Sequence, residues 1–277
     1  MPQGIMTGQL IKQILYRPMQ LAIRPSDYSK AVYREYQPVR ALQNYVCCYW
    51  MIQTKALDSE PFLYHIMTDG CVDLLLNCSS EDPLILAGTV EKAGFVAIKA
   101  QTQYFGIRFF PGCIHYFLPV SAKEIANQEI PCEDIWGNRL KSIEYQLRGA
   151  DSIDQRINIT NGFLLDLLKF WKNEPDQRLL NILDIIYQRK GQLSVEKDTS
   201  AGISSRHLRR VFKEYIGISP KKFSKIVRFQ SVLRHMMLNP KHISKGGYLD
   251  FGYFDQPHFI HEFKSLSGIT PNFLKQL

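Results

Sequence analysis

No run of apolar residues in this sequence approaches the ~20 residues that a bilayer-spanning helix requires. Polar residues interrupt the apolar ones near the N-terminus, at Gln9, Lys12, Gln13 and Arg17, so the core of a signal peptide is also missing. Both absences favour a cytoplasmic protein that has no membrane partner.

Cysteine pairs with metal-binding or redox spacing are missing too. The six cysteines all lie in the first half of the chain, and none belongs to a Cys-x-x-Cys pattern: Cys47, Cys48, Cys71, Cys78, Cys113 and Cys132. This argues against a disulfide framework or a zinc site. We expect small buried hydrophobic side chains in a reducing compartment, with a redox-sensing pair as the alternative.

The sequence also lacks the usual catalytic signatures. Its seven histidines form no His-x-His or His-Glu-x-x-His pattern, so a catalytic metal has no support. It has no Gly-x-Ser-x-Gly motif, no phosphate-binding loop and no Gly-x-Gly-x-x-Gly motif. We therefore expect a protein that is not an enzyme and needs neither a metal nor a cofactor.

The sequence does contain an internal repeat. One module occurs twice, at residues 204–220 and 255–271, with a constant offset of 51 positions. Each copy has apolar residues at i and i+4, as on one face of a helix, and then a glycine followed by a Ser-Pro or Thr-Pro pair. The aligned pairs are His207 and His258, Leu208 and Phe259, Phe212 and Phe263, Lys213 and Lys264, Gly217 and Gly268, Ile218 and Ile269, Ser219 and Thr270, and Pro220 and Pro271. Two short helices with polar, partly basic outer faces predict a pair of recognition helices.

Basic residues are concentrated in the same part of the chain. From Arg178 to the end there are 17 basic and 7 acidic residues, whereas the first 177 residues hold 17 basic and 19 acidic ones. A basic domain joined to a neutral or acidic one is typical of a nucleic-acid-binding domain attached to a sensing or assembly domain. A solvated basic surface without a partner is the alternative.

Short apolar segments separated by turns predict strands between Tyr45 and Phe110. The expected strands are 45–52, 62–67, 71–76, 84–88, 94–98 and 104–110, and Asp69-Gly70 predicts a hairpin between the second and third. Because no helical pattern interrupts this series, we expect a mainly antiparallel β-sandwich or small barrel.

Helical patterns follow, and with them the predicted division of the chain. Ser121 and Glu124 predict a capping box. An apolar helical stripe serves either as domain core or as a dimer contact, and it consists of Phe163, Leu164, Leu167, Leu168 and Trp171. We expect a sensor or dimerisation domain at 1–174, β-rich over about 38–118 and helical over about 121–172. We expect an all-α domain at 175–277, with two helix-turn-helix units joined by a linker helix that begins at Ser219-Pro220.

The C-terminal residues resemble a known family. Ser204-x-Arg-His-Leu-x-Arg-x-Phe-Lys213 and Phe251-Gly-Tyr-Phe-Asp-Gln-Pro-His-Phe-Ile-His-Glu-Phe-Lys264, followed by Gly268-Ile-Thr-Pro271, resemble the AraC/XylS family of bacterial transcription regulators. The first half is similar, less closely, to the cupin-like sensor domains of some members. That likeness rests on 68–73, 106–112 and 133–137. The resemblance implies a DNA-binding transcription regulator.

Two segments depart from the family pattern. Residues 195–201 lack the usual Leu-Ala pair and are one residue short. Residues 244–248 place two glycines where the family has Ile-Ala, and are one residue long. Glycine in a helix costs about 0.5–1 kcal/mol per position relative to alanine. We therefore expect distorted supporting helices, which would weaken DNA binding.

Helical spacing and the resemblance together indicate the residues that contact DNA. In the first recognition helix they are Ser204, Ser205, Arg206, His207, Arg209 and Arg210, and in the second they are Gln256, Pro257, His258, Ile260 and His261. The three arginines suit guanine, Gln256 suits adenine, and Pro257 or Ile260 suits a thymine methyl group. We expect the two histidines that begin the repeat to contact phosphate or to cap their helices. Phosphate contact alone is the alternative for each arginine.

Three residues are candidates for a ligand site in the first half: Asp73, Arg108 and His65. Asp73 and Arg108 interrupt apolar strands. They either contact a small-molecule effector, occupy outward-facing strand positions, or form an ion pair that holds the barrel together. The expected partners are double-stranded DNA, an effector, RNA polymerase and a second copy of the chain. The competing interpretation is a ligand-binding or enzymatic cupin-like domain that carries a degenerate helix-turn-helix adaptor.

Overall fold

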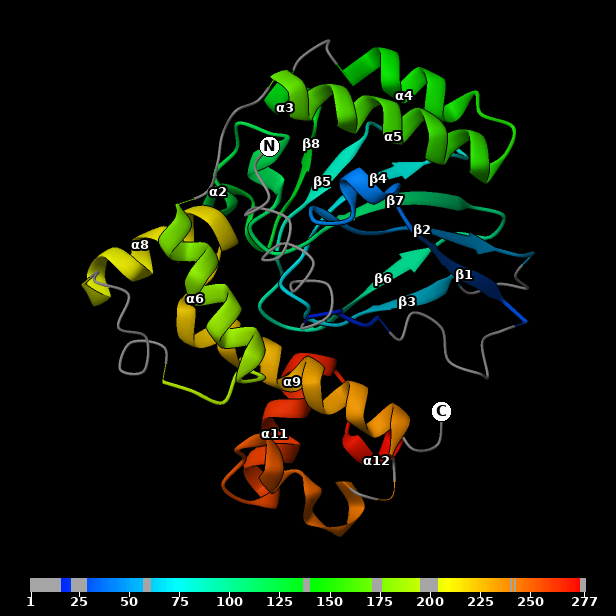
Figure 1. Cartoon of the computed structure of the whole chain (residues 1–277). Helices are drawn as coiled ribbons and strands as arrows, with labels where there is room; N and C mark the ends of the chain where they lie inside the picture. The colour runs from blue at the N-terminus through cyan, green and yellow to red at the C-terminus, as the bar shows by residue number, and fades with distance from the viewer. Residues whose placement is uncertain are drawn as a thin grey trace.

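In the computed structural model of the chain, a β-rich N-terminal domain lies against a helical C-terminal domain (Figure 1). The structure describes residues 16–20, 29–56, 61–136, 140–170, 176–194, 204–239, 241 and 243–274. This architecture confirms the predicted fold class. Trp171 of the predicted apolar stripe and the departure at 195–201 lie outside the described residues.

Two antiparallel sheets form the N-terminal domain. The strands are β1 (Ala31–Tyr36), β2 (Val46–Thr54), β3 (Phe62–Ile66), β4 (Val72–Asn77), β5 (Ile85–Ala87), β6 (Gly94–Ile98), β7 (Gln103–Phe109) and β8 (Glu129–Pro131). Six of them form one sheet in the order β1-β2-β7-β4-β5-β8, and β3 pairs with β6 in the other. Side chains alternate along β4, where Val72, Leu74 and Leu76 are buried and the residues between them are less so.

The hairpin predicted at Asp69-Gly70 does not form. Instead, β3 pairs with β6, while β4 pairs with β7 and β5. Gly70 does adopt the positive φ, +74°, that the Asp-Gly pair favours. However, its Cα packs against the ring of Phe223 in the C-terminal domain, so the chain passes from one sheet to the other there.

Helices cover one face of the six-stranded sheet, where α4 (Lys141–Arg148) and α5 (Ile153–Phe170) lie across the strands (Figure 1). The shorter helices are α2 (Ala122–Ile125), α3 (Glu133–Trp136), η2 (Arg40–Leu42) and η3 (Ile114–Tyr116). The capping box expected at α2 is absent because the Ser121 hydroxyl bonds to Glu214 of the C-terminal domain. Strands β1 and β8 lie outside the predicted β-rich range.

The C-terminal domain is helical throughout its described residues. Its elements are α6 (Gln177–Gln188), α8 (Ser205–Ile216), α9 (Pro220–Leu238), η5 (Ile243–Gly247), η6 (Leu249–Phe251), α11 (Gln256–Ser267) and α12 (Pro271–Leu274). The long helix α9 connects α8 to the second unit and supplies most of the core, with Phe223, Ile226, Phe229 and Val232 fully buried.

The two domains share part of one core. Tyr16, which precedes the first strand, stacks on Tyr187 of α6 with ring centroids 4.7 Å apart, and Met67 joins the same hydrophobic cluster. Residues from the N-terminal domain therefore complete the core of the helical domain. The domain boundary at 174/175 stays a prediction.

Candidate nucleic-acid interface and an internal cavity

Helix α8 begins and ends as its sequence predicts. The Ser204 hydroxyl accepts a hydrogen bond from the His207 backbone N–H at 3.3 Å, which caps the first turn. Gly217 ends the helix at φ +85°, a left-handed conformation that favours glycine. Leu208, Val211, Phe212 and Ile216 face the core. The polar residues of the first turns are therefore turned outward.

Five of the six candidate residues on α8 are exposed to solvent: Ser204, Ser205, Arg206, Arg209 and Arg210. His207 is half-buried, and its Nδ1 lies 3.5 Å from the guanidinium of Arg210. This places one ring nitrogen beside an arginine expected to contact DNA. The arrangement is compatible with a positioning role for His207.

Helix α11 repeats the same construction. Asp255 accepts a hydrogen bond from the His258 backbone N–H at 2.8 Å, and Gly268 ends the helix at φ +78°. Gln256, Pro257 and His261 are exposed. Ile260 is half-buried and packs against the core, so less of it is available to a partner than the spacing predicted. The His258 ring accepts a hydrogen bond from Phe254 N at 3.3 Å, as expected for a capping histidine.

A buried carboxylate fixes α11 on the linker helix. Glu262 is 5% exposed and binds Arg228 of α9 through contacts of 2.5 and 3.0 Å, with Lys225 at 3.0 Å. Burial acts to raise the pKa of Glu262, but the two cations outweigh it and the net pKa shift is downward. Arg228 also lies over the ring of Tyr253 at 4.4 Å. These contacts set the position of α11 relative to α9.

The segment before α11 departs from an ordinary helix. Residues Ile243–Gly247 form a π-helical turn rather than an α-helical one. A π-turn accommodates one additional residue, which agrees with the one-residue excess and the paired glycines that the sequence shows here. The predicted distortion of this supporting helix is therefore present.

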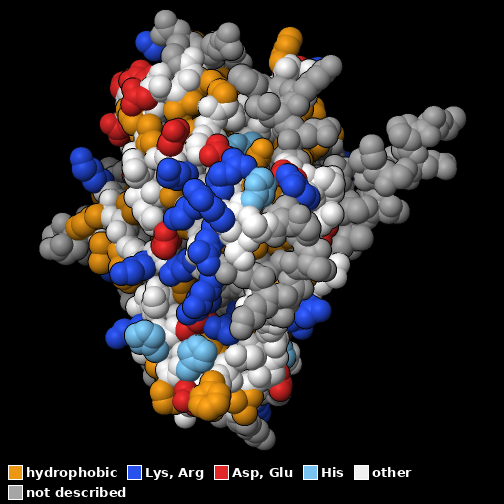
Figure 2. Space-filling view, turned by 90° about the vertical axis from the view of Figure 1, so that its left-hand side faces the viewer, with side chains coloured by type: hydrophobic (Ala, Val, Ile, Leu, Met, Phe, Trp, Pro, Cys, Tyr) orange, Lys and Arg blue, Asp and Glu red, His pale blue; other side chains and the backbone are white. Residues whose placement is uncertain are grey.

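Basic side chains gather on the face where these helices lie. Figure 2 shows Lys and Arg side chains in a band over the side of the molecule that carries α6 and α8, with histidines near α11 at its lower end. The exposed basic residues of α6 and α8 are Arg178, Arg206, Arg209 and Arg210, and Lys221 is exposed at the start of α9. A positively charged band of this kind is typical of a surface that binds a polyanion.

Comparison with known proteins agrees with this geometry. A family described as "Helix-turn-helix domain" matches residues 199–276. The C-terminal part of the chain is therefore similar to this helix-turn-helix family. This helix-turn-helix domain supports the expected class, a DNA-binding transcription regulator, and such regulators are generally not enzymes.

Residues 34–131 match a domain of unknown function, DUF6597. A crystal structure of an apo ToxT variant from Vibrio cholerae is 11% identical in sequence, with a TM-score of 0.39 over 88% of this chain and 95% of that chain. No curated protein matches. No described helix is long and apolar enough to cross a membrane, and the described residues contain no cluster of metal-binding side chains.

The C-terminal ends of both recognition helices dock on the N-terminal domain. A Cβ on Gly217 would lie 2.7 Å from the Ala122 carbonyl oxygen, and one on Gly268 would lie 2.8 Å from His65 Nε2. Near the second contact, the Thr68 backbone N–H donates to the Leu266 carbonyl at 3.1 Å. The sheet domain therefore contacts equivalent glycines of the two units of the helix-turn-helix domain.

The N-terminal domain encloses a cavity of about 760 Å³ between its two sheets. Its apolar lining comes from both sheets and includes Trp50, Ile52, Tyr64, Ile66, Leu75, Val96 and Ile98. A volume of this size suits a small organic ligand. Except for Gln20, Asn127, Gln128 and Glu129, its described lining residues lie between Trp50 and Arg108.

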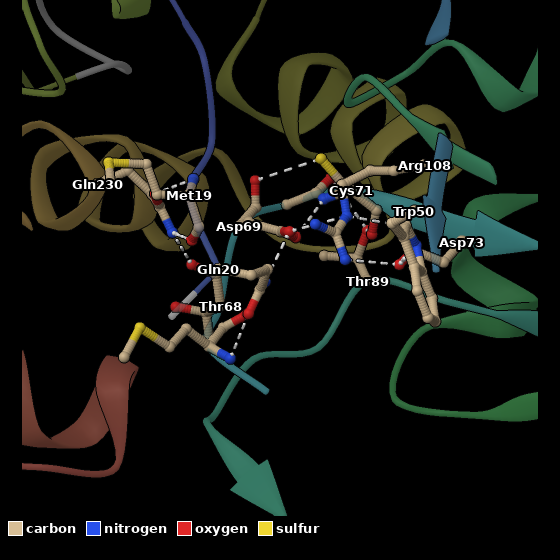
Figure 3. A network of polar contacts seen from close by, with 12 residues as sticks. Met19, Gln20, Trp50, Thr68, Asp69, Cys71, Asp73, Thr89, Arg108 and Gln230 are labelled. Carbon is tan, nitrogen blue, oxygen red and sulfur yellow. Dashed lines mark hydrogen bonds and ion pairs between the residues drawn. The ribbon is translucent and has the colours of Figure 1, made fainter. Parts of the chain in front are cut away.

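At one end of the cavity, Arg108 of β7 pairs with Asp73 of β4 (Figure 3). Its Nε lies 3.0 Å from Oδ1 and its NH2 lies 2.7 Å from Oδ2, and Trp50 Nε1 donates to the same carboxylate at 3.1 Å. Burial raises the pKa of Asp73, and Arg108 opposes that shift. The pair joins two strands, as the ion-pair interpretation predicted, and it also lines the cavity, while its contact with an effector stays a prediction.

Polar contacts that the sequence patterns did not predict lead from this pair to α9. Asp69 lies 3.4 Å from Arg108 and accepts a hydrogen bond from Gln20 at 2.8 Å. Gln230 of α9 bonds to both the N–H and the carbonyl of Met19 and to the Thr68 carbonyl (Figure 3). One feature of the sequence could have indicated these contacts: Gln230 is a polar residue on the otherwise mostly apolar buried face of α9.

His65, the third candidate for the ligand site, lies elsewhere. It is 7% exposed, stacks on Phe95 with ring centroids 4.5 Å apart, and faces Gly268 at the domain junction. It is not among the residues that line the cavity. Its position indicates a role in domain packing.

Proposed function

We propose that this protein is a sequence-specific transcription regulator whose helices α8 and α11 read two half-sites in successive major grooves. The observation that carries the proposal is the duplicated helix, with the same cap, the same glycine end and an exposed polar first turn in each copy. Successive major grooves on one face of DNA lie about 34 Å apart. One helix, α9, joins the two units, so one chain supplies both readers.

Within α8, Arg206, Arg209 and Arg210 are the proposed readers of base edges, because guanidinium groups bind guanine O6 and N7 through two bonds. All three are exposed on the same helix. Ser204 and Ser205 lie at its N-terminus, where hydroxyl and backbone N–H groups suit phosphate. His207 positions Arg210 or contacts phosphate.

Within α11, Gln256 is the proposed reader of adenine and Pro257 the contact for a thymine methyl group. Both are exposed in the first turn of the helix. His261 is exposed one turn later, and Ile260 offers only its outer edge. His258 serves as a cap, because its ring already accepts the Phe254 N–H.

We also propose that a small-molecule effector occupies the cavity and changes the activity of the DNA-binding domain. The cavity end formed by Arg108 and Asp73 lies next to Asp69, from which hydrogen bonds continue through Gln20. The domain junction lies beside this chain of contacts, at Thr68 and Gln230. Dimerisation and a contact with RNA polymerase are further proposals for the whole protein.

Replacing Arg210 or Gln256 by alanine is expected to relax base preference at two separate parts of the binding site. Each loss should cost about 1–3 kcal/mol for the preferred sequence, because a bidentate side-chain contact to one base is removed. Selection of bound sequences from random DNA, followed by titration of the selected site with each variant, measures this effect.

The matched control is Arg40→Ala, which removes an exposed arginine from the N-terminal domain. It should leave the selected sequence unchanged. Binding by the native protein should also weaken steeply with salt as counterions are released. Equal weakening of all sequences by both recognition-helix variants would rule out the assignment of base readers.

A further inference from the structure

The charges that line the cavity are mostly negative. Four acidic residues line it, Asp69, Asp73, Asp82 and Glu129, and Arg108 is the one basic residue among its described lining. Asp69 is buried and Asp73 is half-buried, whereas Asp82 and Glu129 are exposed. Acidic side chains therefore line both the inner end of the cavity, at Asp69 and Asp73, and its solvent-exposed side, at Asp82 and Glu129. The inner end is called the acidic end below.

Two carboxylates already compensate the charge of Arg108. It forms two bonds with Asp73 and lies 3.4 Å from Asp69. A ligand carboxylate or phosphate at this end would lie beside both of these acids and be repelled by them. Since two carboxylates surround a single guanidinium, the acidic end is short of one positive charge.

A buried hydroxyl at the same end lacks a partner. Tyr64 is 6% exposed, and its hydroxyl makes no hydrogen bond within the described part of the chain. Arg108, Asp73 and Asp69 are the charged groups that act on it, and it lines the cavity together with them. Burial raises its pKa above the ordinary value of 10.0, so it stays a neutral O–H. A buried hydroxyl without a partner costs free energy that a polar ligand atom would recover.

The rest of the lining is suited to an apolar body. Trp50 and Tyr64 stack with ring centroids 6.3 Å apart, and Ile52, Val96 and Ile98 continue the surface. Aromatic rings attract cations through their negative faces. The lining thus combines an acidic end, aromatic rings and an aliphatic wall.

We propose that the cavity binds an organic cation, an amine with an aryl or alkyl body, with its ammonium group near Asp69, Asp73 and the Tyr64 hydroxyl. The body lies along Trp50, Ile52 and Ile98. This assignment rests on the proposed function in so far as the ligand is the effector. Binding itself can be measured without DNA.

Ligands that share one apolar body but differ in charge test whether the cavity prefers a cation. The full-length protein is titrated by calorimetry with 2-phenylethylamine, 2-phenylethanol and 3-phenylpropionate, and with octylamine, octanol and octanoate. At least one amine should bind about tenfold or more tightly than its alcohol and its acid, since one charged contact is worth about that factor. Equal or tighter binding of the acids, or no binding of either amine at millimolar concentration, overturns the proposal.

Substitutions of the lining residues test whether the amine binds in this cavity. Asp73→Asn should weaken the preferred amine about tenfold and leave the alcohol unaffected, and Tyr64→Phe should weaken the amine with Asp73 intact. Asp134→Asn, an exposed acid outside the cavity, is the control. An amine affinity that neither cavity variant changes overturns the assignment. Gel shifts of the same protein without amine test DNA binding separately, so a failure of one proposal is distinguishable from a failure of the other.

Discussion

Replacing Arg108 by methionine is expected to lower the free energy of unfolding by about 3 kcal/mol, because the substitution leaves two acids without their cation. Arg108 is 4% exposed and bridges β7 to β4 through Asp73. Methionine keeps much of the side-chain volume, so the loss reports on charge rather than on packing. Urea denaturation followed by circular dichroism measures it.

The pH dependence of this loss has a definite sign. Burial already raises the folded-state pKa of Asp73, and removing Arg108 removes the group that opposes this rise. The folded variant then takes up a proton at Asp73 more readily than the unfolded chain does. Its stability therefore increases as the pH falls through that folded-state pKa. The deficit relative to the native protein should shrink on acidification.

Two further variants separate charge pairing from general damage. Arg34→Met removes an exposed arginine from β1 and should change stability by no more than about 0.5 kcal/mol. Adding Asp73→Leu to Arg108→Met should recover much of the loss, because buried pairs are often replaceable by apolar residues. A pH-independent deficit that the second substitution does not reduce would contradict the role of the pair.

Local features of the recognition helices were predictable from the sequence because short-range chemistry determines them. Ser204 and Asp255 cap the two helices, and Gly217 and Gly268 end them at positive φ. These signals act within about four residues. The same is true of the glycine-rich segment before α11, which forms a π-turn. The DNA contacts of these helices remain predictions.

Features that depend on distant contacts were not predictable in this way. Asp69-Gly70 has the composition of a hairpin turn, and that signal is local. Phe223, which packs against Gly70, lies more than 150 positions away in the sequence, so this contact could not be predicted from the residues around the turn. An ion pair between Asp73 and Arg108 was one of the alternatives that the sequence left open, and it forms because the register of β4 with β7 places the two residues opposite each other. The hydrogen bonds from Gln20 to Asp69 and from Gln230 to Thr68 join residues 49 and 162 positions apart, so no local pattern predicts them.

Replacing Phe223 by alanine is expected to cost about 3–5 kcal/mol, because a fully buried phenyl ring leaves a cavity that its neighbours cannot fill. Its ring centroid lies 6.0 Å from that of Tyr187, 6.1 Å from Phe212 and 6.4 Å from Tyr16. These partners belong to α6, to α8 and to the segment before β1. The loss should therefore loosen the first recognition helix and the domain junction together.

Phe229→Ala, on the same helix, is the matched comparison. Phe229 is equally buried, but its ring packs on Phe263 of α11 with centroids 5.2 Å apart. Hydrogen exchange should therefore show faster opening of α6 and α8 in Phe223→Ala and of α11 in Phe229→Ala. In DNA titrations, each variant should preferentially lose affinity for the half-site assigned to the loosened helix. An identical exchange pattern in the two variants would show that α9 transmits the damage along its whole length, and the two units would then not act as separate readers.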